Sequence, residues 1–160
     1  MGSGGPDLVE PGGHGRWVID LDRGWSTGRL DLGPLAVAQA AELAPLLNDA
    51  SLHEFTGGAP LSAAALAARC ARLAARRLPA VTRCWGNWVV RVRATGAAAG
   101  TVQATLPAGG PAAGPAEVAW VVVPAAQGRG YIAEAARSWQ ECLVMRGRIL
   151  VRRSGRITRK

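Results

Sequence analysis

The chain has 160 residues, of which 49% are hydrophobic and 19% are charged, and its formal net charge is +8. This length and this apolar content suit one domain with a real hydrophobic core, and they exclude a disordered chain. Seven basic residues and no acidic residue lie between positions 146 and 160. The rest of the chain has twelve basic and eleven acidic residues, so its charges nearly cancel. The positive net charge therefore belongs to a C-terminal segment and not to a face of the domain.

The cysteines and the apolar runs favour a cytoplasmic protein. Cys70, Cys84 and Cys142 are odd in number and far apart, as is typical of free thiols in a reducing compartment. The N-terminus lacks the basic and then apolar pattern of a signal peptide. No apolar stretch approaches the length of about eighteen residues that a helix needs to span a bilayer. We therefore expect a soluble cytoplasmic protein with no metal site and no membrane partner.

The first half of the chain predicts two strands and two helices. Residues 1–16 are rich in glycine and proline and are expected to form a flexible leader. The stretches 17-WVIDLD-22 and 29-RLDLGPL-35 alternate apolar and polar residues, as half-buried strands do. Helix-forming residues follow at 35–49, where Pro45 is expected to interrupt the helix or to begin a second one.

A second helix and three strands follow. Ser62 is a candidate N-cap for a helix over 63–77, which has an apolar face and an arginine-rich face expected to be solvated. The stretches 85–95 and 99–107 predict a hairpin. A Gly/Pro-rich loop leads to 117-EVAWVVV-123, whose continuous hydrophobicity predicts a strand covered on both faces. This order of elements predicts an α/β or α+β layered domain with a central sheet.

A glycine-rich turn, 124-PAAQGRGYIAEAA-136, follows the last of these strands and opens a helix. The first turn of a helix has unpaired backbone N–H groups and the positive end of the helix dipole. Glycines let a ligand approach such a backbone closely, and Arg129 adds a positive charge. The turn therefore predicts a ligand that carries phosphate.

Two well-known phosphate-binding motifs do not fit this turn. The P-loop requires G-K-[ST], which is not present. Gly128, Gly130 and Ala133 satisfy the dinucleotide fingerprint G-x-G-x-x-A, but that motif needs an acidic residue about 20 positions later. The region from Leu143 onward has no acidic residue.

The segment 117-EVAWVVVPAAQGRGYIAEAA-136 resembles the fourth strand and following helix of the GNAT superfamily of N-acetyltransferases. The signature of that family is Q/R-x-x-G-x-G/A, which the run from Gln127 to Gly130 matches, whereas Ile132 stands where the family prefers Gly or Ala. With the preceding order of elements, the resemblance covers about residues 28–138. It implies a GNAT-like mixed, mostly antiparallel sheet flanked by helices.

The resemblance also implies a site. The backbone of Val121, Val122 and Val123 would pair with the pantetheine arm of acetyl-CoA, the co-substrate. The pyrophosphate would lie on the amides of Gln127, Gly128, Arg129, Gly130, Tyr131 and Ile132. An amine of a small molecule or of a protein N-terminus would attack the thioester directly. Glu117 is the candidate base, or else a surface glutamate at a strand start, while Glu134 is expected to complement the helix dipole and Tyr131 to pack.

The resemblance ends near residue 138. We therefore expect an acetyltransferase-like domain over 17–138 and an atypical basic segment over 139–160, typical of a truncation or a shifted reading frame. The C-terminal strands of the family are expected to be missing, except for a short one at 149-ILV-151. Two alternatives stay open: a non-catalytic remnant that binds CoA, and a nucleic-acid-binding protein with a basic tail. The oligomeric state is not predicted.

Overall fold

The structure is a computed structural model, and it describes residues 22–49, 51–52, 61–75, 83–107, 114–144 and 149–150. The expected leader, most of the expected strand 17–22 and the end of the basic segment from 151 to 160 lie outside the described residues. The elements follow in the order β1 (Trp25–Ser26), β2 (Leu30–Pro34), η1 (Val37–Gln39), α1 (Ala40–Leu47), α3 (Ala63–Ala75), β3 (Arg83–Val92), β4 (Ala98–Pro107), β5 (Ala116–Val122), η3 (Pro124–Ala126), α4 (Tyr131–Val144) and β6 (Ile149–Leu150).

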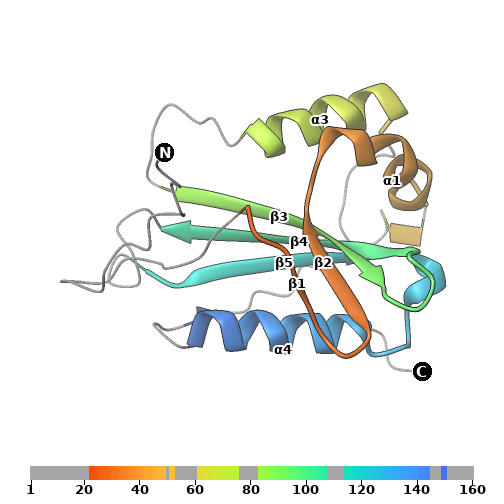
Figure 1. Ribbon diagram of the computed structural model, residues 1–160. Coiled ribbons are helices and arrows are strands. Elements are labelled where there is room, and N and C mark those ends of the chain that lie inside the picture. Colours follow the sequence, from red (N-terminus) through yellow and green to blue (C-terminus); the bar gives the residue numbers. More distant parts are fainter. Residues whose placement is uncertain are drawn as a thin grey trace, which may run out of the picture.

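The strands form one sheet in the order β1-β2-β3-β4-β5-β6. Neighbouring strands from β1 to β5 are antiparallel, and β6 is parallel to β5. Helices α1 and α3 lie over one face of the sheet and α4 over the other (Figure 1). The expected α/β fold with a mixed, mostly antiparallel sheet is confirmed. None of the described helices is both long and apolar enough to cross a bilayer.

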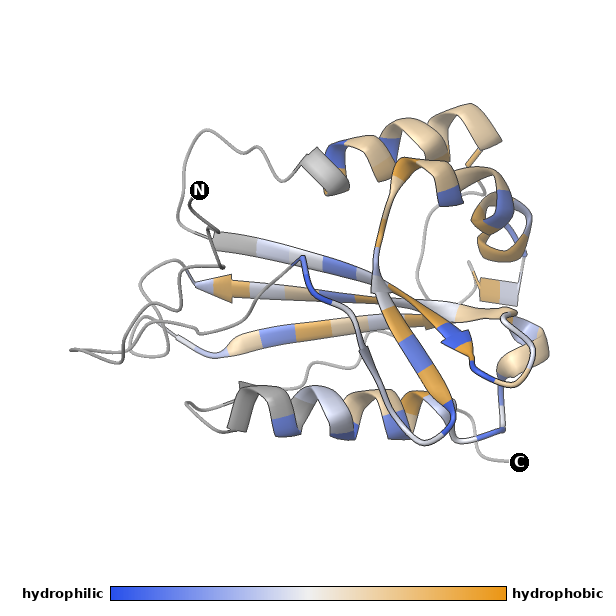
Figure 2. Cartoon of the chain, viewed as in Figure 1, coloured by the Kyte–Doolittle hydropathy of each residue, from blue (hydrophilic) through white to orange (hydrophobic). Residues whose placement is uncertain are grey.

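Each face of the sheet has its own buried cluster, because side chains alternate between the two faces of a strand. The cluster on the α4 face is centred on Trp88 and Trp139, which are 0% and 2% exposed. Trp25 packs edge-on against both rings, with centroids 5.5 and 5.8 Å away. The cluster on the other face joins Leu43 of α1 and Leu66 of α3 to β3. Figure 2 shows apolar residues along the strands and on the helix sides that face them.

Two details differ from the sequence expectations. Pro45 does not interrupt α1, which continues to Leu47. Its missing N–H would have bonded the carbonyl of Ala41, and Ala41 lies at the exposed surface, where water can satisfy that carbonyl. Strand β5 is covered less completely than expected: Ala116 and Val118 are buried, but the rest of the strand is only half-buried.

The C-terminal part of the fold continues beyond residue 138. Helix α4 extends to Val144, and Trp139 belongs to the core. The expected short strand is confirmed at Ile149–Leu150, where it pairs with Ala116 and Glu117. In the described part of the chain, the same edge of β5 has no strand partner beyond Glu117.

Candidate functional site

Along β5, the backbone N–H and C=O groups of successive residues point alternately toward β4 and toward the free edge of the sheet. The N–H of Val123 donates to the carbonyl of Ala99 in β4 (3.0 Å). The carbonyl oxygen of Val121 lies so close to Gly100 of β4 that a Cβ there would collide with it. Val121 and Val123 therefore direct their backbone groups toward β4, and Val122 directs its N–H and C=O toward the free edge.

This edge is suited to an extended ligand. Unpaired strand edges satisfy their N–H and C=O groups by adding another extended segment, which can be a ligand with amide groups. The carbonyl of Val122 accepts a hydrogen bond from Nε2 of the exposed Gln127 side chain (3.3 Å). The end of β5 is thus linked directly to the turn that follows it.

The turn between β5 and α4 depends on its two glycines. A short 3₁₀ helix, η3, ends at Ala126, and the chain then reaches α4 through residues 127–130. Gly128 and Gly130 have φ values of 73° and 74°. An L-residue adopts this left-handed conformation only at an energetic cost, so both positions favour glycine.

Several backbone N–H groups at this turn are available to a ligand. The carbonyl of Gly130 accepts the N–H of Glu134 (3.1 Å), which makes Gly130 the N-cap of α4. Within the described part of the chain, no hydrogen bond uses the N–H groups of residues 128–133. The helix dipole adds partial positive charge at the same place. The side chain of Arg129 is exposed beside it, and this set of donors can hold a phosphate or pyrophosphate group.

Glu134 fastens the β1–β2 hairpin to the first turn of α4. It accepts hydrogen bonds from Oγ1 of Thr27 (2.5 Å), from the N–H of Arg29 (2.9 Å) and from Nε of Arg29 (2.7 Å). The bond from Thr27, followed by those from Arg29, holds the pKa of Glu134 below its ordinary value. Glu134 lies in the first turn as expected, but its role as a clamp was not predicted.

Arg29 is the residue that sequence reasoning missed. Its Nη1 donates to the carbonyl of Arg129 in the turn (3.1 Å). Its guanidinium lies 5.0 Å from the centroid of the Tyr131 ring, within the range of cation–π contacts. Tyr131 itself packs against the core, as expected. Arg29 precedes β2 in the sequence, and only the fold brings it to the turn.

Glu117 lies at the other end of β5 from the turn. Val122 is five positions further along the extended strand, a distance of roughly 17 Å. It pairs with Thr105 in β4 and with Leu150 in β6, and its side chain is half-buried. Since Ala116 and Val118 belong to the cluster under α4, Glu117 lies on the opposite face of the sheet. Ile132, at the sixth signature position, is half-buried in the first turn of α4.

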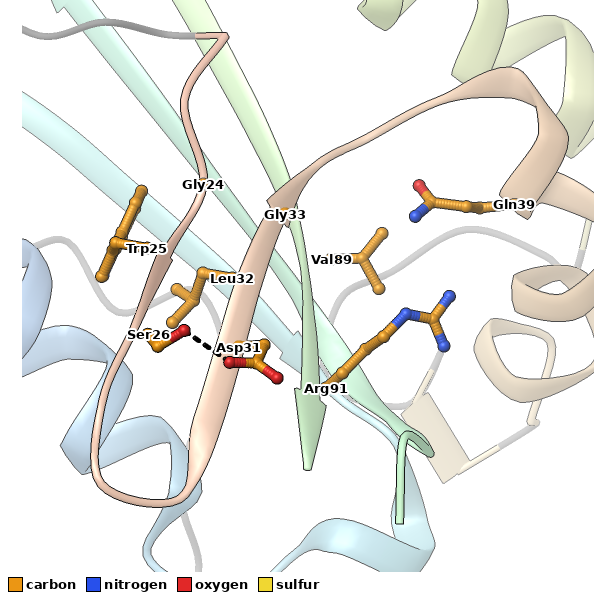
Figure 3. A pocket seen from close by; sticks show the side chains of 9 residues that line it. All are labelled: Gly24, Trp25, Ser26, Asp31, Leu32, Gly33, Gln39, Val89 and Arg91. Atoms are coloured by element: carbon orange, nitrogen blue, oxygen red, sulfur yellow. Dashed lines mark hydrogen bonds between the residues drawn. The ribbon is translucent and has the colours of Figure 1, made fainter. Parts of the chain in front are cut away.

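A cavity of about 260 Å³ lies elsewhere, among β1, β2, β3 and η1 (Figure 3). No residue of the turn lines it. Its polar groups have partners: Ser26 donates to Asp31 (2.6 Å), and Arg91 donates twice to Glu42 (2.7 Å each). Among the described residues, no group of three or more acidic, histidine or cysteine side chains could hold a metal ion. We therefore place the candidate site at the turn and the adjoining edge of β5.

Comparison with known proteins identifies the family of the chain. The family model of the acetyltransferase (GNAT) domain matches residues 29–150, which extends beyond residue 138 to include β6. No curated protein sequence matches the chain.

Solved structures of acetyltransferases share the fold. They include a GNAT-family acetyltransferase from Bacillus anthracis (TM-score 0.58, 14% identity, 74% of this chain and 64% of that one). A second is an acetyltransferase from Salmonella typhimurium that modifies the N-terminal serine of a 50S ribosomal subunit protein (TM-score 0.61, 14% identity, 77% and 68%). A third is an acetyltransferase from Agrobacterium tumefaciens (TM-score 0.52, 24% identity, 74% and 66%). The chain thus spans about two thirds of the length of these structures. Because the family model covers well over half of its residues, the chain belongs to the GNAT acetyltransferase family.

Proposed function

We propose that this chain is an N-acetyltransferase that transfers the acetyl group of acetyl-CoA to an amine of a small molecule or of a protein N-terminus. One observation carries the proposal: a run of unpaired backbone N–H groups at residues 128–133 adjoins the free edge of β5 in a chain of the GNAT family. Phosphate and an extended arm are the two parts of acetyl-CoA that such a surface can bind.

The described residues fit both parts. Of the three residues expected to pair with the pantetheine arm, Val122 directs its backbone toward the free edge, and its bond from Gln127 is long enough to be exchanged for a ligand bond. The N–H of Gln127, which was expected to take part, already donates to the carbonyl of Pro124 (3.2 Å), so the amides that follow it, together with Arg129, would hold the pyrophosphate. Ile132 is half-buried, and its N–H is one of the unpaired donors of this surface.

The chemistry asks little of the protein beyond positioning and proton transfer. A neutral amine attacks the thioester carbonyl carbon, the new C–N bond forms, and the C–S bond breaks as the CoA thiolate leaves. The amine proton passes to a base, for which we propose Glu117 acting directly or through water. Glu117 is half-buried near the far end of β5, so a ligand that starts at the turn and runs along the strand would approach it.

The acceptor and the compartment are also part of the proposal. The Salmonella typhimurium structure belongs to an enzyme that modifies a protein N-terminus, so N-terminal peptides are suitable first acceptors to test. A cytoplasmic location fits the free, buried thiol of Cys70. The comparisons do not favour a non-catalytic remnant or a nucleic-acid-binding protein.

A transfer assay tests this function. The chain is incubated with acetyl-CoA and a panel of amines and N-terminal peptides, while release of the CoA thiol is followed and acetylated product is identified by mass spectrometry. We expect thiol release that depends on the amine. Glu117→Gln should lower kcat, whereas Glu141→Gln, at an exposed glutamate of α4, should not. A chain that binds acetyl-CoA but releases no thiol with any amine would contradict the proposed activity.

A further inference from the structure

The peptide between Arg129 and Gly130 has an orientation that Arg29 fixes. The carbonyl of Arg129 points toward the β1–β2 hairpin, where it accepts a hydrogen bond from Nη1 of Arg29 (3.1 Å). In a trans peptide the C=O and the N–H point in opposite directions. The N–H of Gly130 is therefore directed away from the hairpin, toward the open side of the turn.

This peptide would otherwise be free to rotate. Its rotation changes ψ of Arg129 and φ of Gly130, and glycine populates positive and negative φ about equally. A rotated peptide would present a carbonyl oxygen where the N–H now lies, and a carbonyl repels an anion. The glycines that let a phosphate approach the turn thus also create the need for an external restraint.

Arg29 is well held for this role. Its Nε bonds Oε2 of Glu134 (2.7 Å), and its guanidinium lies over the ring of Tyr131. Both partners belong to the first turn of α4, so the restraint and the helix N-terminus move together. The side chain is nevertheless 53% exposed, so it is not a core residue.

We propose that Arg29 is a positioning residue that locks the Arg129–Gly130 peptide with its N–H toward the bound pyrophosphate. This inference rests on the proposed function, because it assigns the turn to the pyrophosphate of acetyl-CoA. Arg29 acts through the peptide and takes no part in the acetyl transfer.

The β1–β2 hairpin is also held by contacts that do not involve Arg29, so the positioning role of Arg29 can be tested without loss of the fold. Thr27 bonds Glu134, and Nε1 of Trp25 donates to Oγ of Ser138 (3.1 Å). Trp25 also packs against two core tryptophans. Arg29→Ala is therefore expected to fold. Arg93 supplies a matched control: it is 51% exposed, pairs with Asp31 and donates to the carbonyl of Thr27, and among the described residues it has no hydrogen bond or ion pair with the turn.

Calorimetry with two ligands tests the proposal. Arg29→Ala should raise the Kd of acetyl-CoA about tenfold and leave the Kd of S-acetylpantetheine, which lacks the pyrophosphate, unchanged. Arg93→Ala should change both by less than about twofold. Arg29→Lys keeps the charge but not the two-pronged guanidinium, so it should recover only part of the loss. Equal losses for the two ligands, or full recovery by lysine, would overturn the proposal.

A second readout does not depend on the ligand. In the free protein, ¹⁵N relaxation dispersion at Gly130 should be flat in the wild type and in Arg93→Ala, and should show exchange in Arg29→Ala. A flat profile in Arg29→Ala would overturn the inference, whether or not acetyl-CoA binds. Failure of the wild type to bind acetyl-CoA, with exchange present in Arg29→Ala, would keep the restraint and reject the proposed function instead.

Discussion

Replacing Gly130 by alanine tests the effect of backbone conformation at the turn without adding a steric clash. A Cβ at this position would lie 3.6 Å from Nη2 of Arg29, which is an ordinary contact. The cost of Gly130→Ala therefore comes from its φ of 74°, and is roughly 1–2 kcal/mol for an L-residue. The variant either retains this strain or relaxes φ and turns the amides of residues 130–131 away from the ligand.

Gly96 provides the comparison. It has a φ of 71°, a Cβ there would meet nothing within 4 Å, and it lies in the turn between β3 and β4. Urea unfolding should show a similar loss of about 1–2 kcal/mol in both alanine variants. Calorimetry should show about tenfold weaker acetyl-CoA binding only in Gly130→Ala. Equal affinities in two folded variants would refute the assignment of the turn to the ligand.

Three further predictions concern stability. The partners of Glu134 lower its pKa from the ordinary 4.5, so the stability that its carboxylate contributes is present above about pH 4.5 and is lost as the pH falls. The Tm of Glu134→Gln should therefore fall less on acidification than the Tm of the wild type. Gly100→Ala should cost about 3 kcal/mol or more in urea unfolding, because its Cβ collides with a β5 carbonyl, whereas Gly33→Ala meets open space and should be nearly neutral. Trp139→Phe should cost about 1 kcal/mol less than Trp88→Phe, because the indole N–H of Trp88 donates to the carbonyl of Arg23 (3.2 Å), whereas that of Trp139 has no partner among the described residues. An equal cost within either pair would contradict the reasoning.

Features set by neighbouring residues were predictable from the sequence. The β3–β4 hairpin and β5 follow from alternating or continuous apolar residues, and the structure confirms them. Ser62 was expected to cap α3, and its Oγ accepts the N–H of Ala65 (3.1 Å). The glycine turn was equally predictable, because the sequence places two glycines between a strand and a helix.

Features set by distant contacts were not predictable. The bonds from Thr27 and Arg29 to Glu134 join residues more than 100 positions apart, and no local pattern indicates them. The choice of Val122 as the residue that faces the free edge required the register of β4 on β5. The prediction that Pro45 interrupts the helix or begins a second one was wrong, because helix propensity does not take into account whether the lost hydrogen bond lies in solvent or in the core.

The central claim is that the edge of β5 and the glycine turn together bind acetyl-CoA. Titration of acetyl-CoA into the ¹⁵N-labelled, monodisperse chain tests it directly. Saturable micromolar binding is predicted, with the largest amide shifts at residues 128–133 and at Val122. No binding by the folded chain, or shifts confined to the cavity beside η1, would contradict the claim.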